Sequence, residues 1–121
     1  MNHPWLDDYL LAKPGASKNF KAEWGWERYV LRDKLFAAIC DGADGFPVIT
    51  VKCEPEFGEE MRQTFPGKIV PGHYMNKIHW NSVSLVGDVP DEIIKEMIDR
   101  SYLLILHSLP KKAQKEIDEN N

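Results

Sequence analysis

The chain has 121 residues, of which 43% are hydrophobic and 28% are charged. This length and composition are typical of one globular domain that buries a core without disulfides or metal, and they exclude a disordered chain. Its 15 Lys and Arg against 19 Asp and Glu give a formal charge of −4, the wrong sign for strong nonspecific association with nucleic acid.

The first half of the chain predicts a short helix, a hairpin and a further strand. Pro4 can occupy the first position of a helix, which the breaker at residues 13–15 ends. After a polar loop, residues 24–31 and 34–39 are rich in aromatic and branched side chains, a composition that predicts the two strands of a hairpin. The segment D-G-A-D-G then forms a turn, and residues 47–53 predict the third strand.

The second half predicts a helix and two more strands before the last helix. Residues 54–65 place apolar side chains four positions apart, so one stripe of this helix faces the sheet. Residues 68–71 predict a short strand and residues 77–85 a longer one. Apolar residues change face within the longer strand, which indicates either that both faces are partly covered or that a β-bulge near Asn81 and Ser82 resets the alternation.

The final helix begins at Asp88 or Pro90 and ends at Pro110. The predicted order of elements is therefore α-β-β-β-α-β-β-α. We expect a single compact α+β domain over residues 1–113, in which helices pack on an antiparallel sheet. Residues 114–121 are expected to form a frayed, charged C-terminal tail.

The sequence also bears on location and on the state of the cysteines. No apolar run approaches the roughly 20 residues of a membrane helix, and the N-terminus lacks the basic and apolar regions of a secretory signal. We therefore expect a cytoplasmic protein with no membrane partner. Cys40 and Cys53 lie at the edges of apolar runs, where we expect buried thiols and no disulfide.

Catalytic and metal-binding signatures are absent from the sequence. The D-G-A-D-G segment lacks the alternating oxygen ligands of a calcium loop, and the cysteines and histidines lack the spacing of a zinc site. His73 and His79 are the only plausible acid–base groups close to one another, and an enzyme would need a pocket that unites one of them with an acid such as Asp99. We expect no enzymatic activity, no cofactor and no metal.

One window of the acidic chain contains no acid at all. From residue 63 to residue 87 there is no Asp or Glu, and basic and aromatic side chains alternate there: Lys68, His73, Tyr74, Lys77, His79 and Trp80. A basic strand with aromatic residues could meet a phosphate backbone, or it could be an ordinary strand of a sheet. We interpret Trp80 as a core anchor that holds this strand in place.

Several motifs resemble those of one family of small bacterial proteins. They are P-G-H-Y-M-N-K-I-H-W-N-S-V from residue 71, G-D-V-P-D-E-I-I from residue 87 and D-R-S-Y-L-L-I-L-H-S-L-P-K-K from residue 99. The segments L-A-K-P-G-A, D-K-L-F-A-A-I and V-I-T-V-K-C-E-P-E fit the same pattern, so the chain resembles the MmcQ/YjbR family over nearly all of residues 5–113. The resemblance implies a fold of the secretion-chaperone-like type with the element order predicted above.

The resemblance also implies a function, which is weak DNA binding by a double-wing motif. The matching positions would then contact the phosphate backbone through charge and hydrogen bonds: Lys68, His73, Asn76, Lys77, His79 and Asn81. The alternative is a module that binds a protein or peptide, as secretion chaperones do, with no role in nucleic-acid binding. In that case Trp24, Trp26 and Tyr74 would be exposed anchors for the partner.

Overall fold

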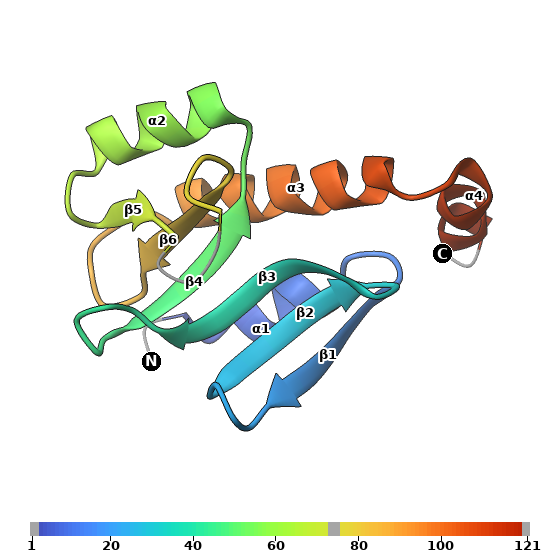
Figure 1. The fold of residues 1–121 in the computed structure, drawn as a ribbon, viewed down its shortest axis with the longest axis horizontal. Coiled ribbons are helices and arrows are strands. Elements are labelled where there is room, and N and C mark those ends of the chain that lie inside the picture. The colour runs from blue at the N-terminus through green and yellow to red at the C-terminus, as the bar shows by residue number, and fades with distance from the viewer. Residues whose placement is uncertain (1–2, 73–75, 120–121) are drawn as a thin grey trace.

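The structure is a computed structural model, and residues 3–72 and 76–119 are described below. An antiparallel sheet forms the centre of the fold, with its strands in the order β1-β2-β3-β4-β6-β5 (Figure 1). The elements are, in chain order, α1 (Leu6–Leu11), β1 (Ala16–Lys21), β2 (Trp26–Leu31), β3 (Lys34–Asp41), β4 (Pro47–Lys52), α2 (Pro55–Thr64), β5 (Ile69–Pro71), β6 (Trp80–Ser84), α3 (Asp91–Ser108) and α4 (Lys111–Glu119). The predicted α+β class and the antiparallel sheet packed by helices are confirmed.

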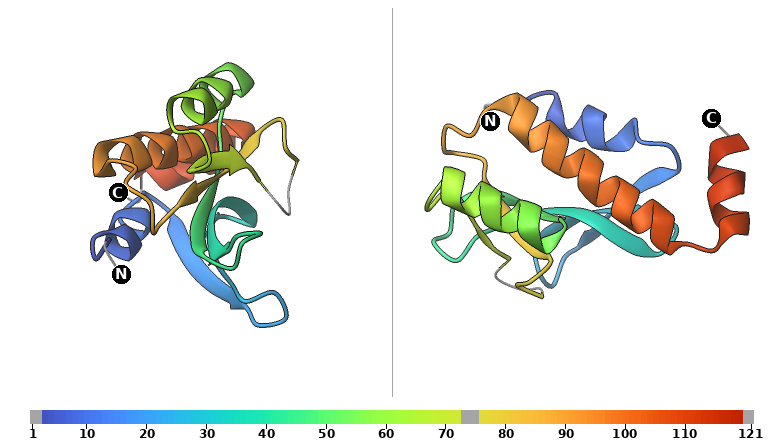
Figure 2. Two further views of the ribbon diagram at one scale, coloured as in Figure 1. Left: turned by 90° about the vertical axis from the view of Figure 1, so that its left-hand side faces the viewer. Right: turned by 90° about the horizontal axis from the view of Figure 1, so that it is seen from above.

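The helices α1, α2 and α3 lie on one face of the sheet (Figure 2). Helix α3 buries Ile94, Met97, Ile98 and Ile105, whose spacing of three and four places them on one stripe. Alternate residues of the strands meet this stripe, among them Tyr29, Leu31, Ile49, Val51 and Val83. A fully buried side chain of this size stabilises the fold by about 1.5–3 kcal/mol, so this face holds the main core.

Ser101 ties α3 to the middle of the sheet through hydrogen bonds. Its hydroxyl donates to the carbonyl oxygen of Phe36 in β3 at 2.6 Å and accepts the backbone N–H of Lys52 in β4 at 2.9 Å. Ser101 is fully buried, so both backbone groups depend on it for a partner. A serine on an otherwise apolar stripe is therefore a structural residue.

The sheet has one strand more than the sequence predicts. Residues 16–21, expected to lie in a polar loop, form β1 and pair with β2 in register from Ala16 with Leu31 to Lys21 with Trp26. The four central residues of β1 are exposed on both faces, so no alternation of apolar and polar residues marks the strand. Backbone hydrogen bonds hold it as the polar edge of the sheet.

The expected frayed tail is wrong for residues 114–119, because the chain continues as helix α4 after Pro110. Ala113 and Ile117 lie four positions apart, and both pack against the main core. The side chains of Arg32 and Glu116 form an ion pair at 3.3 Å that also holds this helix. One apolar stripe of two residues was too short to distinguish a helix from a charged tail.

Strand β6 keeps a regular register with both β4 and β5, so the described pairing contains no bulge at Asn81 and Ser82. Both faces of the strand are covered there, since Asn81, Ser82 and Val83 are all buried. Trp80 is only half-buried and belongs to neither apolar cluster, so its interpretation as a core anchor is wrong. The register irregularity that does occur lies in β2, between Tyr29 and Val30.

Cys40 and Cys53 are buried free thiols, as predicted. Burial raises the pKa of the Cys53 thiol to about 12 and also raises that of Cys40. Both groups therefore remain neutral in the core. Among the described residues, no helix is both long enough and apolar enough to cross a membrane.

Candidate nucleic-acid interface

Among the described elements, no helix packs on the sheet face opposite α1, α2 and α3 (Figure 2). We call it the open sheet face, and its side chains include Asn19, Lys21, Trp26, Arg28, Leu35, Ala38, Cys40, Val48, Thr50, Lys52, Val70, Trp80, Ser82 and Ser84. One continuous row crosses all six strands, from Asn19 in β1 to Val70 in β5. Within this row Arg28 donates to Asn19 at 3.2 Å, and the hydroxyls of Thr50 and Ser82 lie 2.8 Å apart.

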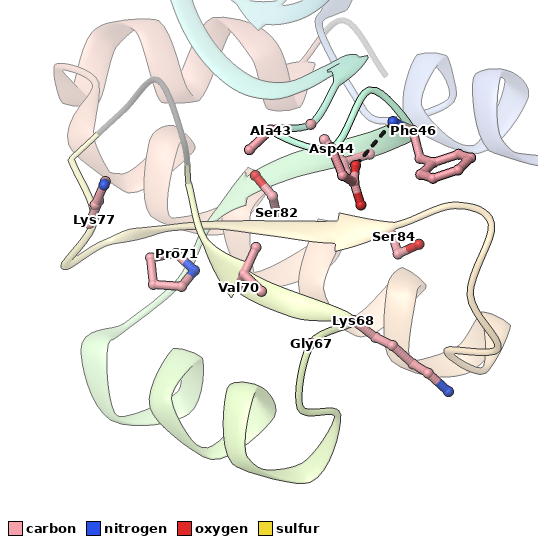
Figure 3. Close-up of a pocket in the computed structure, with 12 residues that line it drawn as sticks. Ala43, Asp44, Phe46, Gly67, Lys68, Val70, Pro71, Lys77, Ser82 and Ser84 are labelled. Atoms are coloured by element: carbon pink, nitrogen blue, oxygen red, sulfur yellow. Dashed lines mark hydrogen bonds between the residues drawn. The ribbon is translucent and has the colours of Figure 1, made fainter.

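A cavity of about 360 Å³ lies at one end of this face, between the β3–β4 loop and strands β5 and β6 (Figure 3). Val48, Val70, Ser82 and Ser84 line it from the sheet, and Lys68 and Lys77 line it from the loops. The β3–β4 loop closes its third side with Ala43, Asp44 and Phe46, where the Asp44 carboxylate accepts the Phe46 N–H at 3.0 Å. Apolar walls and two cations therefore share one depression.

Lys68 and Lys77, two of the six predicted phosphate contacts, line the same cavity, but their electrostatic states differ. Lys68 forms an ion pair with Asp88, and this hydrogen bond lowers the pKa of the Asp88 carboxyl below its usual value. Lys77 is exposed, and within the described ranges no acid forms an ion pair with it. Lys77 is thus the more available cation.

Asn76 and His79 belong to the turn that carries Lys77. The side-chain oxygen of Asn76 accepts a hydrogen bond from the N–H of Ile78 at 2.8 Å, and the backbone carbonyl oxygen of Asn76 accepts one from the N–H of Trp80 at 2.9 Å. The carbonyl oxygen of His79 accepts the N–H of Cys53 at 2.7 Å and fixes the end of the turn to β4. The hydrogen bonds of Asn76 and of the His79 backbone therefore position the turn, and contact of the two side chains with phosphate stays a prediction. His73 lies outside the described residues.

Asn81, also predicted to contact phosphate, does not line the cavity with Lys68 and Lys77. It is fully buried on the helix side of β6, where its side-chain oxygen accepts a hydrogen bond from Arg62 in α2 at 2.5 Å. Gly58 passes so close that a β-carbon there would lie 2.8 Å from the Asn81 amide nitrogen. A ligand on the open sheet face cannot reach this residue.

Two aromatic side chains beside the open sheet face were not predicted as nucleic-acid contacts. Trp24 in the β1–β2 turn is 59% exposed, and Phe46 at the cavity is 56% exposed. Trp24 was expected to be exposed only if the protein bound a peptide, whereas its neighbour Trp26 is buried. The signal that could have found Trp24 is its position directly before Gly25, at the tip of a hairpin where nothing covers it.

Charge is unevenly distributed between the helices and the strands. The helices α1, α2 and α3 carry nine acids and three bases, whereas the six strands carry two acids and five bases. The net charge is therefore −6 on these helices and +3 on the strands. The overall charge of −4 hides this difference, since nine of the 19 acids lie on these three helices, which pack on the face opposite the open sheet face.

The acid that a histidine-based enzyme would require is already engaged on the helix side. Asp99 accepts hydrogen bonds from the Tyr9 hydroxyl at 2.7 Å and from the Lys13 amine at 2.5 Å. Burial, together with the hydrogen bond to Asp99, raises the pKa of Tyr9 to about 12. In the described part of the chain, no group of three or more His, Cys, Asp or Glu side chains could hold a metal ion.

The chain is similar in sequence to one protein family and to several known proteins. The YjbR family model matches residues 11–104. The chain is 33% identical over 110 residues to the uncharacterised protein YjbR of Escherichia coli K12, covering 91% of this chain and 92% of that protein. It is 29% identical over 105 residues to the uncharacterised protein YyaQ of Bacillus subtilis, covering 85% and 82%.

Solved structures agree with these sequence matches. The crystal structure of Deinococcus radiodurans protein DR2400, a DUF419 domain, superposes with a TM-score of 0.81 at 30% identity, covering 93% of this chain and 85% of that one. The crystal structure of a Pseudomonas syringae protein superposes with a TM-score of 0.73 at 25% identity, covering 87% and 99%. The chain therefore belongs to the YjbR family.

Proposed function

We propose that this protein binds DNA weakly through the open sheet face and the cavity at its end. The observation that carries the proposal is the separation of charge, with a net charge of −6 on α1, α2 and α3 and +3 on the strands. Phosphate groups are attracted to the strand side and repelled by the helix side, so the charge distribution sets the orientation of the complex. No catalytic role is included in the proposal.

The cations near the open sheet face are few, so the affinity is low and sensitive to salt. They are Lys21, Arg28 and Lys52 on the strands, and Lys68 and Lys77 at the cavity. Each phosphate contact contributes about −0.9 to the slope of the logarithm of the affinity against the logarithm of the salt concentration, so two to four contacts give about −2 to −4. Because Lys68 is already paired with Asp88, we expect it to contribute less to phosphate binding than the other cations.

Fluorescence anisotropy with labelled DNA tests the proposal. The double variant Lys68→Ala, Lys77→Ala should bind more weakly at about 20 mM salt, with a salt slope shallower by about 0.9 from the loss of Lys77 and by a smaller amount from the loss of Lys68, which is paired with Asp88. Lys111→Ala, Lys112→Ala is the matched control, since it removes the same charge from exposed positions of α4, at the far end of the molecule (Figure 1). The proposal fails if the wild type binds no DNA, or if the two double variants lose affinity equally.

A peptide-binding role is the second candidate, and the apolar walls of the cavity favour it. Phe46, Val48, Val70 and Pro71 line the cavity, and the adjoining β5 is a short strand at the edge of the sheet to which an extended peptide could add. Binding to such a peptide would depend little on salt. Phe46→Ala would then abolish peptide binding, whereas the two lysines would be dispensable.

A further inference from the structure

We infer that the DNA bound by the open sheet face is single-stranded, and that the ring of Trp24 is a platform on which one base stacks. The inference rests on the proposed DNA binding and adds the form of the nucleic acid and a residue that recognises it. The geometry of the β1–β2 turn supports this inference. The turn does not include the cavity or its lysines.

Trp24 is exposed, yet its position is fixed. Its ring lies edge-on to Trp26, with the two ring centroids 5.2 Å apart and the planes at 64°. Trp26 is only 8% exposed and packs in a small apolar cluster with Cys40 and Val48, so it provides a rigid support. The backbone N–H of Trp24 also donates to the carbonyl oxygen of Lys21 at 3.1 Å. An exposed aromatic ring held in this way can stack on a base at little cost in side-chain entropy.

A cation accompanies the exposed ring. The amine of Lys21 lies 5.2 Å from the centroid of the Trp24 ring, and Lys21 pairs with Trp26 across β1 and β2. The side chain of Arg28 lies on the same face, in the neighbouring row of the sheet. Pairing a ring with a nearby ammonium is the combination that binds a base and its phosphate together.

The turn and the cavity belong to one continuous surface. Trp26 and Val48 belong to the same small apolar cluster, and Val48 also lines the cavity beside Phe46. The path from β2 to β5 crosses four strand spacings in the order β2-β3-β4-β6-β5, which is about 19 Å. A single strand of about four nucleotides, at the lower end of known site sizes, fits such a path.

The exposed ring discriminates between the two forms of DNA. In a duplex the flat faces of the bases are stacked on one another, so Trp24 would have no base to contact. A single strand presents its bases and its phosphates to the same flat surface, which here carries both aromatic rings and cations. The open sheet face thus carries the kinds of groups that bind single-stranded DNA.

The test compares a labelled oligothymidylate of about twelve nucleotides with a duplex of equal length, by anisotropy at about 20 mM salt. The oligothymidylate should bind more tightly than the duplex and quench tryptophan fluorescence. Trp24→Ala should weaken single-strand binding by about 5- to 150-fold, whereas Trp24→Phe should retain most of it. Phe20→Ala is the matched control, because Phe20 is 61% exposed on the same hairpin but pairs with Glu27, on the helix side.

The outcomes separate this inference from the proposed function. Equal or tighter binding of the duplex, or unchanged single-strand binding by Trp24→Ala, overturns the single-strand inference and leaves lysine-dependent DNA binding standing. If neither form of DNA binds the wild type, the proposed function and the inference both fail. Circular dichroism of each variant confirms that a loss of binding is not a loss of fold. If Trp24→Ala does not fold, Trp24→Leu decides the question, because it keeps an apolar side chain without an aromatic ring and should weaken binding where Trp24→Phe does not.

Discussion

The ion pair between Lys68 and Asp88 predicts that one substitution should strengthen DNA binding. Both side chains lie near the surface, with Lys68 43% exposed and Asp88 81% exposed. A phosphate that approaches Lys68 must therefore displace the Asp88 carboxylate, whose pKa is lowered by its hydrogen bond with Lys68. Asp88→Asn removes this competitor and should convert Lys68 into a full phosphate contact.

The size of the effect follows from counterion release. One additional phosphate contact steepens the salt slope by about 0.7 for a single strand, so the advantage of Asp88→Asn over the wild type should grow about fivefold for each tenfold fall in salt concentration. The assay is an anisotropy titration with the oligothymidylate at about 20 mM and about 200 mM salt. The affinity ratio of variant to wild type is compared between the two conditions.

A matched control separates the local effect from the change in net charge. Asp8→Asn removes the same charge from an exposed position of α1, on the opposite side of the sheet. If Asp88→Asn leaves the slope unchanged, or if Asp8→Asn steepens it as much, then Lys68 does not contact phosphate and the reasoning is refuted.

The remaining predictions concern the stability of the scaffold. Ser101→Ala should lower the free energy of unfolding by about 1–3 kcal/mol in urea denaturation, because it leaves the buried carbonyl of Phe36 and the N–H of Lys52 without their partner; an unchanged midpoint would contradict this. The folded state raises the pKa of Tyr9 from 10.0 to about 12, so the stability that its protonated hydroxyl provides is complete below pH 10.0 and is lost as the pH rises toward 12. Tyr9→Phe should therefore lose less stability than the wild type between these pH values, and an equal loss would show that the hydrogen bond to Asp99 does not contribute.

The elements that could be predicted from the sequence are those that bury a regular pattern of apolar residues. Helix α3 and strand β4 were found because their apolar residues follow the helical and strand periods that packing on one core imposes. Strand β1 and helix α4 were missed for the opposite reason. The central residues of β1 are exposed on both faces, and α4 is marked by little more than Ile117, so neither carries a clear period.

The candidate site was predicted in part. Lys68 and Lys77 were both predicted as phosphate contacts, and the acid-free window that contains them spans both sides of the cavity. Asn81 was also predicted as a phosphate contact, although its position two residues before the apolar Val83 in a strand places both side chains on the core side. The support of the Trp24 ring by Trp26 could not be predicted, because it depends on how the hairpin closes.

The charge separation could not be read from the linear sequence. The acids of α1, α2 and α3 lie far apart in the sequence, and only the packing of these helices on one face of the sheet brings them to the same side. A net charge of −4 consequently argued against DNA binding, whereas the distribution of that charge supports the proposal.

The central claim is that the open sheet face, and not the helix face, meets DNA. Two-dimensional amide NMR of the labelled protein, titrated with the oligothymidylate at low salt, tests this most directly. Chemical-shift changes should concentrate at Trp24, at Lys77 and on the strands between them, with the indole signal of Trp24 among the largest. Changes centred on α1 and α3, or the absence of changes at saturating DNA, would contradict the account.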